Sequence, residues 1–203
     1  MNYDSKHVEI VNPKEWYDQV ANQYKYSHKH LDSFYNVDFL RFLPRKETFD
    51  IIDLGAGDGR MFKEINQIPH NKYIATDISK EMLSKHPRGP KHLVTDLEKD
   101  FPLEDEEFDL AFCFFTLEHI ENLQHFLEEC YRILKREWTL FIGHFFQRKL
   151  FKRTANNHYF KIKQYKRTTQ EIEEQGEKSF FQVEIFPLYD KKDHTGDLII
   201  MRK

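Results

Sequence analysis

Short apolar segments alternate with amphipathic stretches through the middle of the chain. The apolar segments have the length and the isoleucine, valine and phenylalanine content of buried strands, and they cover 49–52, 73–75, 93–95, 108–115 and 139–142. Apolar residues then recur at helical spacing between Ile120 and Leu134. This alternation predicts an α/β fold with a parallel sheet and right-handed crossovers. In such a sheet a ligand binds beyond the carboxyl ends of the strands.

The N-terminal part of the chain carries helix signals of a different kind. Asn12-Pro13-Lys14-Glu15 combines an N-cap residue, a proline suited to the first turn and an acid at the third position. Aromatic and apolar residues follow at helical spacing as far as Tyr24. A second helix is predicted from Leu31 to Leu43, because Pro44 ends the pattern. We therefore predict an N-terminal helical segment, 1–44, ahead of one compact domain, 45–203.

The strand at 49–52 leads into a glycine-rich loop. Asp53 is followed by Gly55, Gly57 and Gly59, in the pattern D-x-G-x-G-x-G. Arg60 stands where a dinucleotide fingerprint needs its third glycine, and the phosphate-binding pattern G-x-x-x-x-G-K-[ST] is absent from the sequence. From about residue 58 the pattern turns helical, which would place free N–H groups at the loop. An acid two residues before the first glycine suits a ligand with an ammonium group better than a pyrophosphate.

Two further acids end the next strands. Asp77 follows the apolar segment 73–75, about 20 residues beyond the loop, where an acid accepts hydrogen bonds from ribose hydroxyls. Asp96 follows 93–95 in the same way. The carboxyl ends of parallel strands meet at one edge of the sheet, so we expect these acids to lie near the glycine loop.

These segments, together with Phe108–Phe115, Thr116-Leu117-Glu118-His119-Ile120 and Tyr131–Lys135, resemble the Rossmann-like (class I) S-adenosylmethionine (SAM) methyltransferases. Within that superfamily the chain resembles the type 11 group, which includes ubiquinone- and menaquinone-pathway enzymes. The resemblance covers roughly 45–142. Arg136-Glu137-Trp138 departs from the Pro-Gly-Gly turn that is common in the family.

The resemblance implies a three-layer Rossmann-like sandwich. Its sheet has seven mostly parallel strands, it ends in an antiparallel C-terminal hairpin, and residues 1–44 fold over the cofactor as a lid. A helix near 168–177 and strands over 180–188 and 198–201 fit that C-terminal arrangement.

The resemblance also implies SAM as cofactor, with S-adenosylhomocysteine (SAH) as its product. The cofactor-binding residues that it implies are Asp53, Gly55, Ala56, Gly57, Gly59, Asp77, Ile78, Asp96, Leu97, Phe114 and Tyr24. His119 and His144 follow two strands and are the candidate general bases, because a histidine titrates near neutrality. The alternative for each histidine is a packed or capping residue.

Composition limits the remaining possibilities. The net charge of −3 gives no overall argument for nucleic-acid or membrane binding, and no apolar stretch is long enough to span a bilayer. The two cysteines, Cys113 and Cys130, lie in apolar patterns without metal-ligand spacing, so we expect buried thiols, no metal site and a cytoplasmic protein.

A basic insert lies at about 147–168. It contains eight lysine or arginine residues, interleaved with aromatic residues, and no acid. It can be a solvated face, a site for a small anionic substrate or an RNA-contacting arm. The leading hypothesis is methyl transfer to an O, N or C atom of a small molecule, which can be anionic. The alternatives are an RNA methyltransferase that uses this insert, and a SAM-binding partner subunit without catalysis. The sequence carries no prediction of the oligomeric state.

Overall fold

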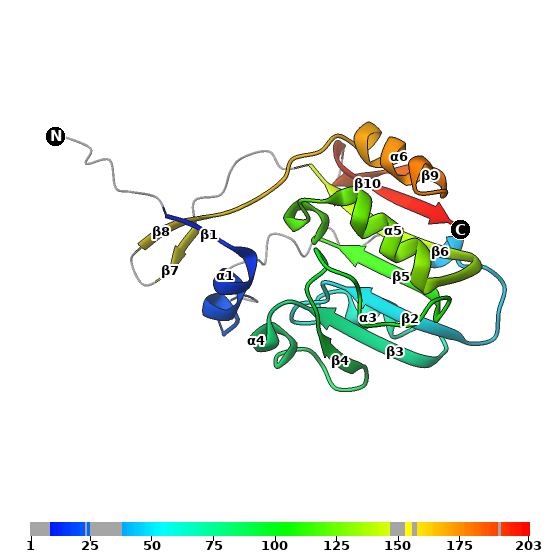
Figure 1. The fold of residues 1–203 in the computed structure, drawn as a ribbon, viewed down its shortest axis with the longest axis horizontal. Helices are drawn as coiled ribbons and strands as arrows, with labels where there is room; N and C mark the ends of the chain where they lie inside the picture. The colour runs from blue at the N-terminus through cyan, green and yellow to red at the C-terminus, as the bar shows by residue number, and fades with distance from the viewer. Residues whose placement is uncertain (1–8, 23, 25–37, 147–152, 156–157, 191) are drawn as a thin grey trace.

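A seven-stranded sheet forms the centre of the computed structural model, which describes residues 9–22, 24, 38–146, 153–155, 158–190 and 192–203. Its strand order is β4-β3-β2-β5-β6-β10-β9 (Figure 1). The strands are β2 (Phe49–Leu54), β3 (His70–Asp77), β4 (Lys91–Val94), β5 (Phe108–Phe114), β6 (Leu134–Phe145), β9 (Gln182–Asp190) and β10 (Asp193–Arg202). β2, β3, β4, β5 and β6 pair in parallel, whereas β10 is antiparallel to both β6 and β9. The predicted α/β fold with its antiparallel C-terminal hairpin is confirmed.

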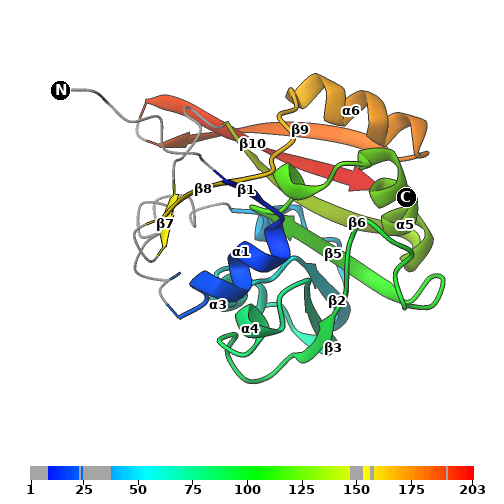
Figure 2. The same cartoon turned by 60° about the vertical axis from the view of Figure 1, so that its left-hand side comes forward.

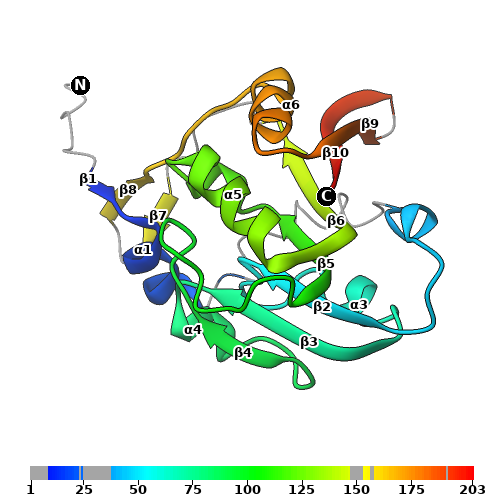
Figure 3. The same ribbon diagram turned by 45° about the vertical axis from the view of Figure 1, so that its right-hand side comes forward.

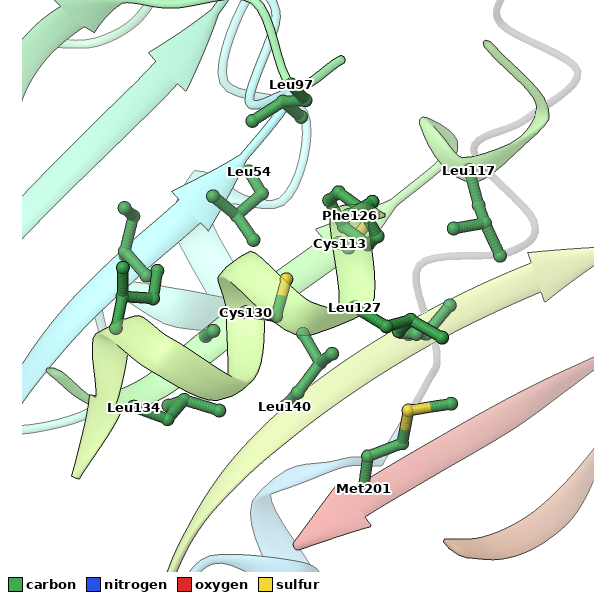
Figure 4. Packing of buried hydrophobic residues seen from close by; sticks show 14 of the residues in the cluster. Leu54, Leu97, Cys113, Leu117, Phe126, Leu127, Cys130, Leu134, Leu140 and Met201 are labelled. Carbon is green, nitrogen blue, oxygen red and sulfur yellow. The ribbon is translucent and has the colours of Figure 1, made fainter. Parts of the chain in front are cut away.

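Helices cover both faces of this sheet (Figure 3). α5 (Leu123–Ile133) and α6 (Thr169–Lys178) pack on the face that carries Ile52 and Leu54 of β2. α3 (Phe62–Ile65), α4 (Lys80–Leu83) and the 3-10 helix η2 (Leu40–Phe42) lie on the face of Ile51. Successive residues of a strand point to opposite faces, so the apolar run of β2 serves both layers. Figure 4 shows Leu127 and Cys130 of α5 over Cys113 and Leu140 of the sheet.

Local capping explains where two of the helices begin. α1 (Pro13–Val20) starts as predicted, because the Asn12 side chain accepts a hydrogen bond of 2.9 Å from the Glu15 N–H. α6 starts after Thr168, which forms a capping box with Glu171.

The helix after the glycine loop starts later than the sequence indicates. α3 begins at Phe62, whereas the pattern predicts helix from about residue 58. Gly59 has φ +81°, a left-handed conformation that a right-handed helix cannot include. Residues 58–61 therefore form turns.

The departure at Arg136–Trp138 is accommodated by an irregularity in β6. This strand follows α5 directly, and Glu137 adopts φ +66°. The Glu137 N–H donates to the Lys203 carbonyl at 3.0 Å, and the Lys203 N–H donates to the Trp138 carbonyl at the same distance. The C-terminus thus holds a kink where the family commonly has a glycine turn.

A second, three-stranded sheet joins the N-terminal segment to the basic insert. β1 (Glu9–Val11) pairs in parallel with β8 (His158–Ile162), which pairs antiparallel with β7 (Arg153–Ala155). This sheet lies beyond the carboxyl ends of β2, β3 and β5 (Figure 1), and α1 lies between it and α4 (Figure 2).

Part of the predicted N-terminal helical segment cannot be compared with the structure. Residues 25–37 lie outside the described ranges, and of the predicted second helix the described part contains only η2. The boundary between 1–44 and 45–203 stays a prediction. In the described ranges, no helix combines the length and the apolar character needed to cross a membrane.

Candidate functional site

A cavity of about 560 Å³ opens at the carboxyl ends of β2, β3 and β5. This volume falls in the range of small-molecule sites. Every predicted cofactor residue except Gly59 lines it, namely Tyr24, Asp53, Gly55, Ala56, Gly57, Asp77, Ile78, Asp96, Leu97 and Phe114. In the described part of the chain, no group of three or more His, Cys, Asp or Glu side chains is arranged as metal ligands would be.

The three loop glycines meet different requirements. All three have positive φ, but a Cβ on Gly55 would lie 2.2 Å from the Thr116 hydroxyl oxygen. A Cβ on Gly59 would lie 2.4 Å from Pro87 Cδ, away from the cavity. A Cβ on Gly57 would meet only the flexible end of Met82, at 3.3 Å, and the Asp77 carboxylate, at 3.9 Å. Gly55 and Gly59 are therefore needed for packing within the chain as well as for the turn.

The loop N–H groups already have partners inside the protein. Ala56 donates to the Thr76 carbonyl at 2.7 Å, Gly57 donates to Asp77 Oδ2 at 3.0 Å, and Gly59 donates to the Ala56 carbonyl at 3.0 Å. A phosphate-binding loop instead aims such groups at its ligand. The N–H groups of Ala56, Gly57 and Gly59, which were expected to be free, are bonded within the protein instead, because the turns and Asp77 accept their hydrogen bonds.

Asp77 connects the glycine loop to the start of α4. Its Oδ2 accepts from Gly57, and its Oδ1 accepts from the Ser79 N–H at 2.8 Å. Burial raises the pKa of Asp77 to about 6, although these two hydrogen bonds act in the opposite direction. Each carboxylate oxygen can accept a second hydrogen bond. Asp77 can therefore hold the loop and still receive hydroxyl groups from a ligand.

Asp53 is the second buried carboxylate of the cavity, and it is only 2% exposed. Burial raises its pKa to about 7, and the nearby Asp77 adds to the rise. The Tyr73 hydroxyl donates to Asp53 Oδ2 at 3.3 Å and partly opposes the shift. Two buried carboxylates favour a cationic or hydroxyl-rich ligand over a phosphate, because like charges repel.

The remaining predicted cofactor residues differ in their surroundings. Asp96 Oδ1 accepts from the Glu98 N–H at 3.1 Å, and Leu97 is buried beside it. Phe114 lines the cavity at the end of β5, but its ring also packs against Phe39, with the ring centres 5.8 Å apart.

Comparison with known proteins agrees with this arrangement. Residues 52–142 match the family described as a methyltransferase domain. This part of the chain is similar to that family.

The relatives extend the similarity over more of the chain. One is MJ1123 of Methanocaldococcus jannaschii, an uncharacterised protein that is 40% identical over 93 residues, or 45% of this chain and 42% of that protein. Another is the demethylmenaquinone methyltransferase of Chlamydia felis, 29% identical over 138 residues, or 64% of this chain and 59% of that protein. The chain thus spans roughly half the length of these relatives. The solved complex of DhpI with SAH has the same fold, with a TM-score of 0.75, 18% identity and 93% coverage of each chain.

The N-terminal segment closes one wall of the cavity. On α1, Asp18 Oδ1 accepts from the Ser79 hydroxyl at 2.6 Å, next to Asp77. Tyr24 lies under the Arg60 guanidinium, which is 5.2 Å from the ring centre. Tyr17 and Tyr24 both line the cavity, and a lid formed by this segment stays a prediction.

The two predicted histidines lie in different places. His119, in η3 (Leu117–His119), lines the cavity, and its Nε2 is 2.9 Å from the Tyr17 hydroxyl. His144 lies on β6 opposite Asp197 of β10 and is not part of the wall that the described residues form. Burial lowers the pKa of His144. The expectation that His144 opens toward the cavity is wrong, because β6 is one strand further from the glycine loop and β10 covers its other edge.

The C-terminal end of the basic insert is fastened to the loop that carries His119. Arg167 donates to the carbonyls of Leu117, Ile120 and Glu121 at 3.2, 2.6 and 2.8 Å. Lys163 donates to Glu121 Oε2 at 3.0 Å, and the Tyr165 hydroxyl donates to the same oxygen.

Sequence reasoning missed several residues that build the site. Tyr17, Ser79, Thr116 and Arg167 were not predicted to have these roles. Two of them carried a sequence signal: Thr116 lies in a segment that resembles the family, and Arg167 lies in the basic insert, which left a solvated face, a small-anion site and an RNA-contacting arm open. The structure instead shows contacts within the chain.

Proposed function

We propose that this chain binds SAM in the cavity and transfers its methyl group to a small-molecule acceptor. One observation carries the proposal. Two buried carboxylates, Asp53 and Asp77, border a glycine loop whose Ala56, Gly57 and Gly59 N–H groups bond within the protein. Such a site rejects a pyrophosphate and accepts an ammonium group and ribose hydroxyls. The match of residues 52–142 to the methyltransferase-domain family supports the same conclusion.

The residues present fit the parts of this cofactor. Asp77 would receive the ribose hydroxyls, Asp53 the ammonium end, and Asp96 with Leu97 would flank the adenine. When bound, SAM supplies a methyl carbon that its sulfonium makes electrophilic. The protein contributes orientation and exclusion of water. α1 and the 163–167 segment, which line the cavity opposite the sheet, serve that exclusion.

The acceptor shares the cavity with the cofactor, which favours a small molecule over a polymer. The wall formed by α1 and the insert presents two cations, Lys14 and Lys163, that already form ion pairs with Asp18 at 2.7 Å and Glu121 at 3.0 Å. An anionic acceptor would have to compete with these carboxylates. His119 is the candidate proton acceptor of this wall.

The alternatives receive less support. An RNA methyltransferase that uses the basic insert was an alternative hypothesis. Lys163 and Arg167 bond within the chain, and residues 147–152 and 156–157 of the insert lie outside the described residues. The departure at Arg136–Trp138 was a sequence hint of a partner subunit without catalysis. It is a kink that the C-terminus holds, and it lies at the opposite end of β6 from Phe145.

Calorimetric titration with SAM and with SAH tests the proposal. We expect micromolar binding to the wild-type chain and at least tenfold weaker binding to Asp77→Asn, because a charged hydrogen-bond acceptor is worth about 1.5 to 3 kcal/mol. Asp100→Asn is the matched control, since its carboxylate is 93% exposed. A folded wild-type protein that binds neither compound would overturn the proposal.

A further inference from the structure

A tyrosine of the N-terminal segment meets a histidine of the methyltransferase domain across the cavity. The Tyr17 hydroxyl and His119 Nε2 are 2.9 Å apart. The two rings stand edge to face, with centres 5.5 Å apart and planes at 85°. Both side chains line the cavity, although they are 102 residues apart in the sequence.

The backbone on each side of this contact is held by separate interactions. On α1, Trp16 and Val20 are buried against Met82 of α4, and Asp18 bonds to the Ser79 hydroxyl. On the other side, Arg167 holds the loop after η3 through three carbonyls. The hydroxyl–imidazole contact therefore joins two anchored elements.

Chemistry gives this pair a use at the acceptor. A tyrosine hydroxyl can accept one hydrogen bond while it donates another, and a neutral imidazole nitrogen can accept a proton. A methyl acceptor such as an alcohol or an N–H group must lose its proton as the new bond forms. A hydroxyl on the cavity wall that is bonded to an imidazole can pass that proton on.

Resting on the proposed function, we propose that Tyr17 and His119 form a proton relay for an acceptor that carries an O–H or N–H group. The acceptor atom bonds to the methyl carbon while the carbon–sulfur bond breaks, and that bond's electron pair stays on sulfur. The acceptor proton moves to the Tyr17 oxygen, and the Tyr17 proton moves to His119 Nε2. The positive charge lost at sulfur thus reappears on His119.

The relay operates among other charged and titratable groups. Those on the adjoining cavity wall are Lys14 of α1, Glu98 after β4, Glu121 after η3, and Lys163 and Tyr165 of the insert. Among the possible acceptors of the Tyr17 proton, Glu121 already accepts hydrogen bonds from Lys163 and Tyr165. His119 is the one that lies within hydrogen-bond distance of the Tyr17 hydroxyl.

Histidine NMR tests the contact without an acceptor. Nitrogen-15 spectra of the wild-type chain, with and without SAH, should show His119 Nε2 as a hydrogen-bond acceptor. Tyr17→Phe keeps the ring and removes the hydroxyl, so the Nε2 signal and its titration midpoint should shift. Tyr131→Phe on α5 is the matched control. Unchanged His119 signals in Tyr17→Phe would overturn the relay.

Turnover tests the role in proton transfer. In a screen of alcohols, phenols and amines with methyl-labelled SAM, Tyr17→Phe and His119→Ala should each lower kcat at least about 100-fold, the usual range for acid–base groups. The double variant should be no slower than the single ones, because the two groups act together. Wild-type kcat in Tyr17→Phe would refute the relay.

SAH calorimetry on the same variants separates the two proposals. Tyr17→Phe should bind SAH within twofold of wild type, whereas a wild-type chain that fails to bind SAH refutes the proposed function itself.

Discussion

Replacing Asp53 by asparagine should stabilise the ligand-free protein at neutral pH. Asp53 is 2% exposed, and burial raises its pKa from 3.8 to about 7. The folded state therefore holds this proton to a higher pH than the unfolded state does. The contribution of Asp53 to the free energy of unfolding should fall as the pH rises from about 4 to about 7 and then level off. An asparagine side chain cannot ionise, so this fall should be absent from the variant.

The expected magnitude follows from the size of the shift. A rise from 3.8 to about 7 corresponds to about 4 kcal/mol, at about 1.4 kcal/mol per pKa unit. Burying the asparagine amide costs about 1 to 3 kcal/mol. We therefore expect Asp53→Asn to gain about 2 kcal/mol at pH 8, or about 4 to 8 °C in Tm for a chain of this size. At pH 5 the gain should vanish.

Thermal unfolding by circular dichroism, at several pH values between 5 and 8 and without ligand, measures this difference. Asp100→Asn, on the surface, is the matched control and should leave Tm unchanged. If Asp53→Asn is less stable than the wild-type chain by the same amount at pH 5 and at pH 8, the reasoning is refuted. That result would mean that burial does not destabilise the charged carboxylate.

Three other outcomes are expected. In calorimetry, SAH should bind at least tenfold more weakly at pH 5.5 than at pH 7.5. Asp53 and Asp77, with pKa values of about 7 and about 6, become protonated at the lower pH and lose the charges that receive the ammonium and hydroxyl groups of SAH. Equal affinity at the two pH values would contradict this. In chemical denaturation, Gly55→Ala should lower the free energy of unfolding by about 2 kcal/mol or more, because of its positive φ and the clash with Thr116, whereas Gly57→Ala should lower it by about 1 kcal/mol. Equal losses in the two variants would argue against a packing role for Gly55. Arg167→Ala should cost about 1 to 3 kcal/mol, because it leaves carbonyls without their donor, while the exposed Lys166→Ala should stay within about 0.5 kcal/mol; a neutral Arg167→Ala would contradict it.

The sequence was sufficient to predict the large sheet and the carboxylate side of the site. Asp53, Gly55 and Asp77 lie in or just after buried strands, and parallel pairing of β2 with β3 brings them together. Such local patterns predict the site correctly, because a strand that pairs in a parallel sheet also ends at the edge where a ligand binds.

The other side of the cavity depends on pairings that no local pattern contains. β1 is three residues long and pairs with β8, about 150 residues later in the chain. The partnership of Tyr17 with His119 likewise joins residues that are 102 positions apart. For Arg167, as part of the basic insert, the sequence left a solvated face, a small-anion site and an RNA-contacting arm open, whereas its partners are carbonyls brought near by folding. His144 was expected at the site from its place near a strand end, but the order of the strands separates it from the loop.

We propose that the glycine loop and its two carboxylates select SAM over phosphate-linked nucleotides. Titration of the ligand-free protein at pH 7.5 with SAH and, in parallel, with NADH tests this most directly. We expect saturable heat with SAH and none with NADH. Binding of NADH, with no response to SAH, would contradict it.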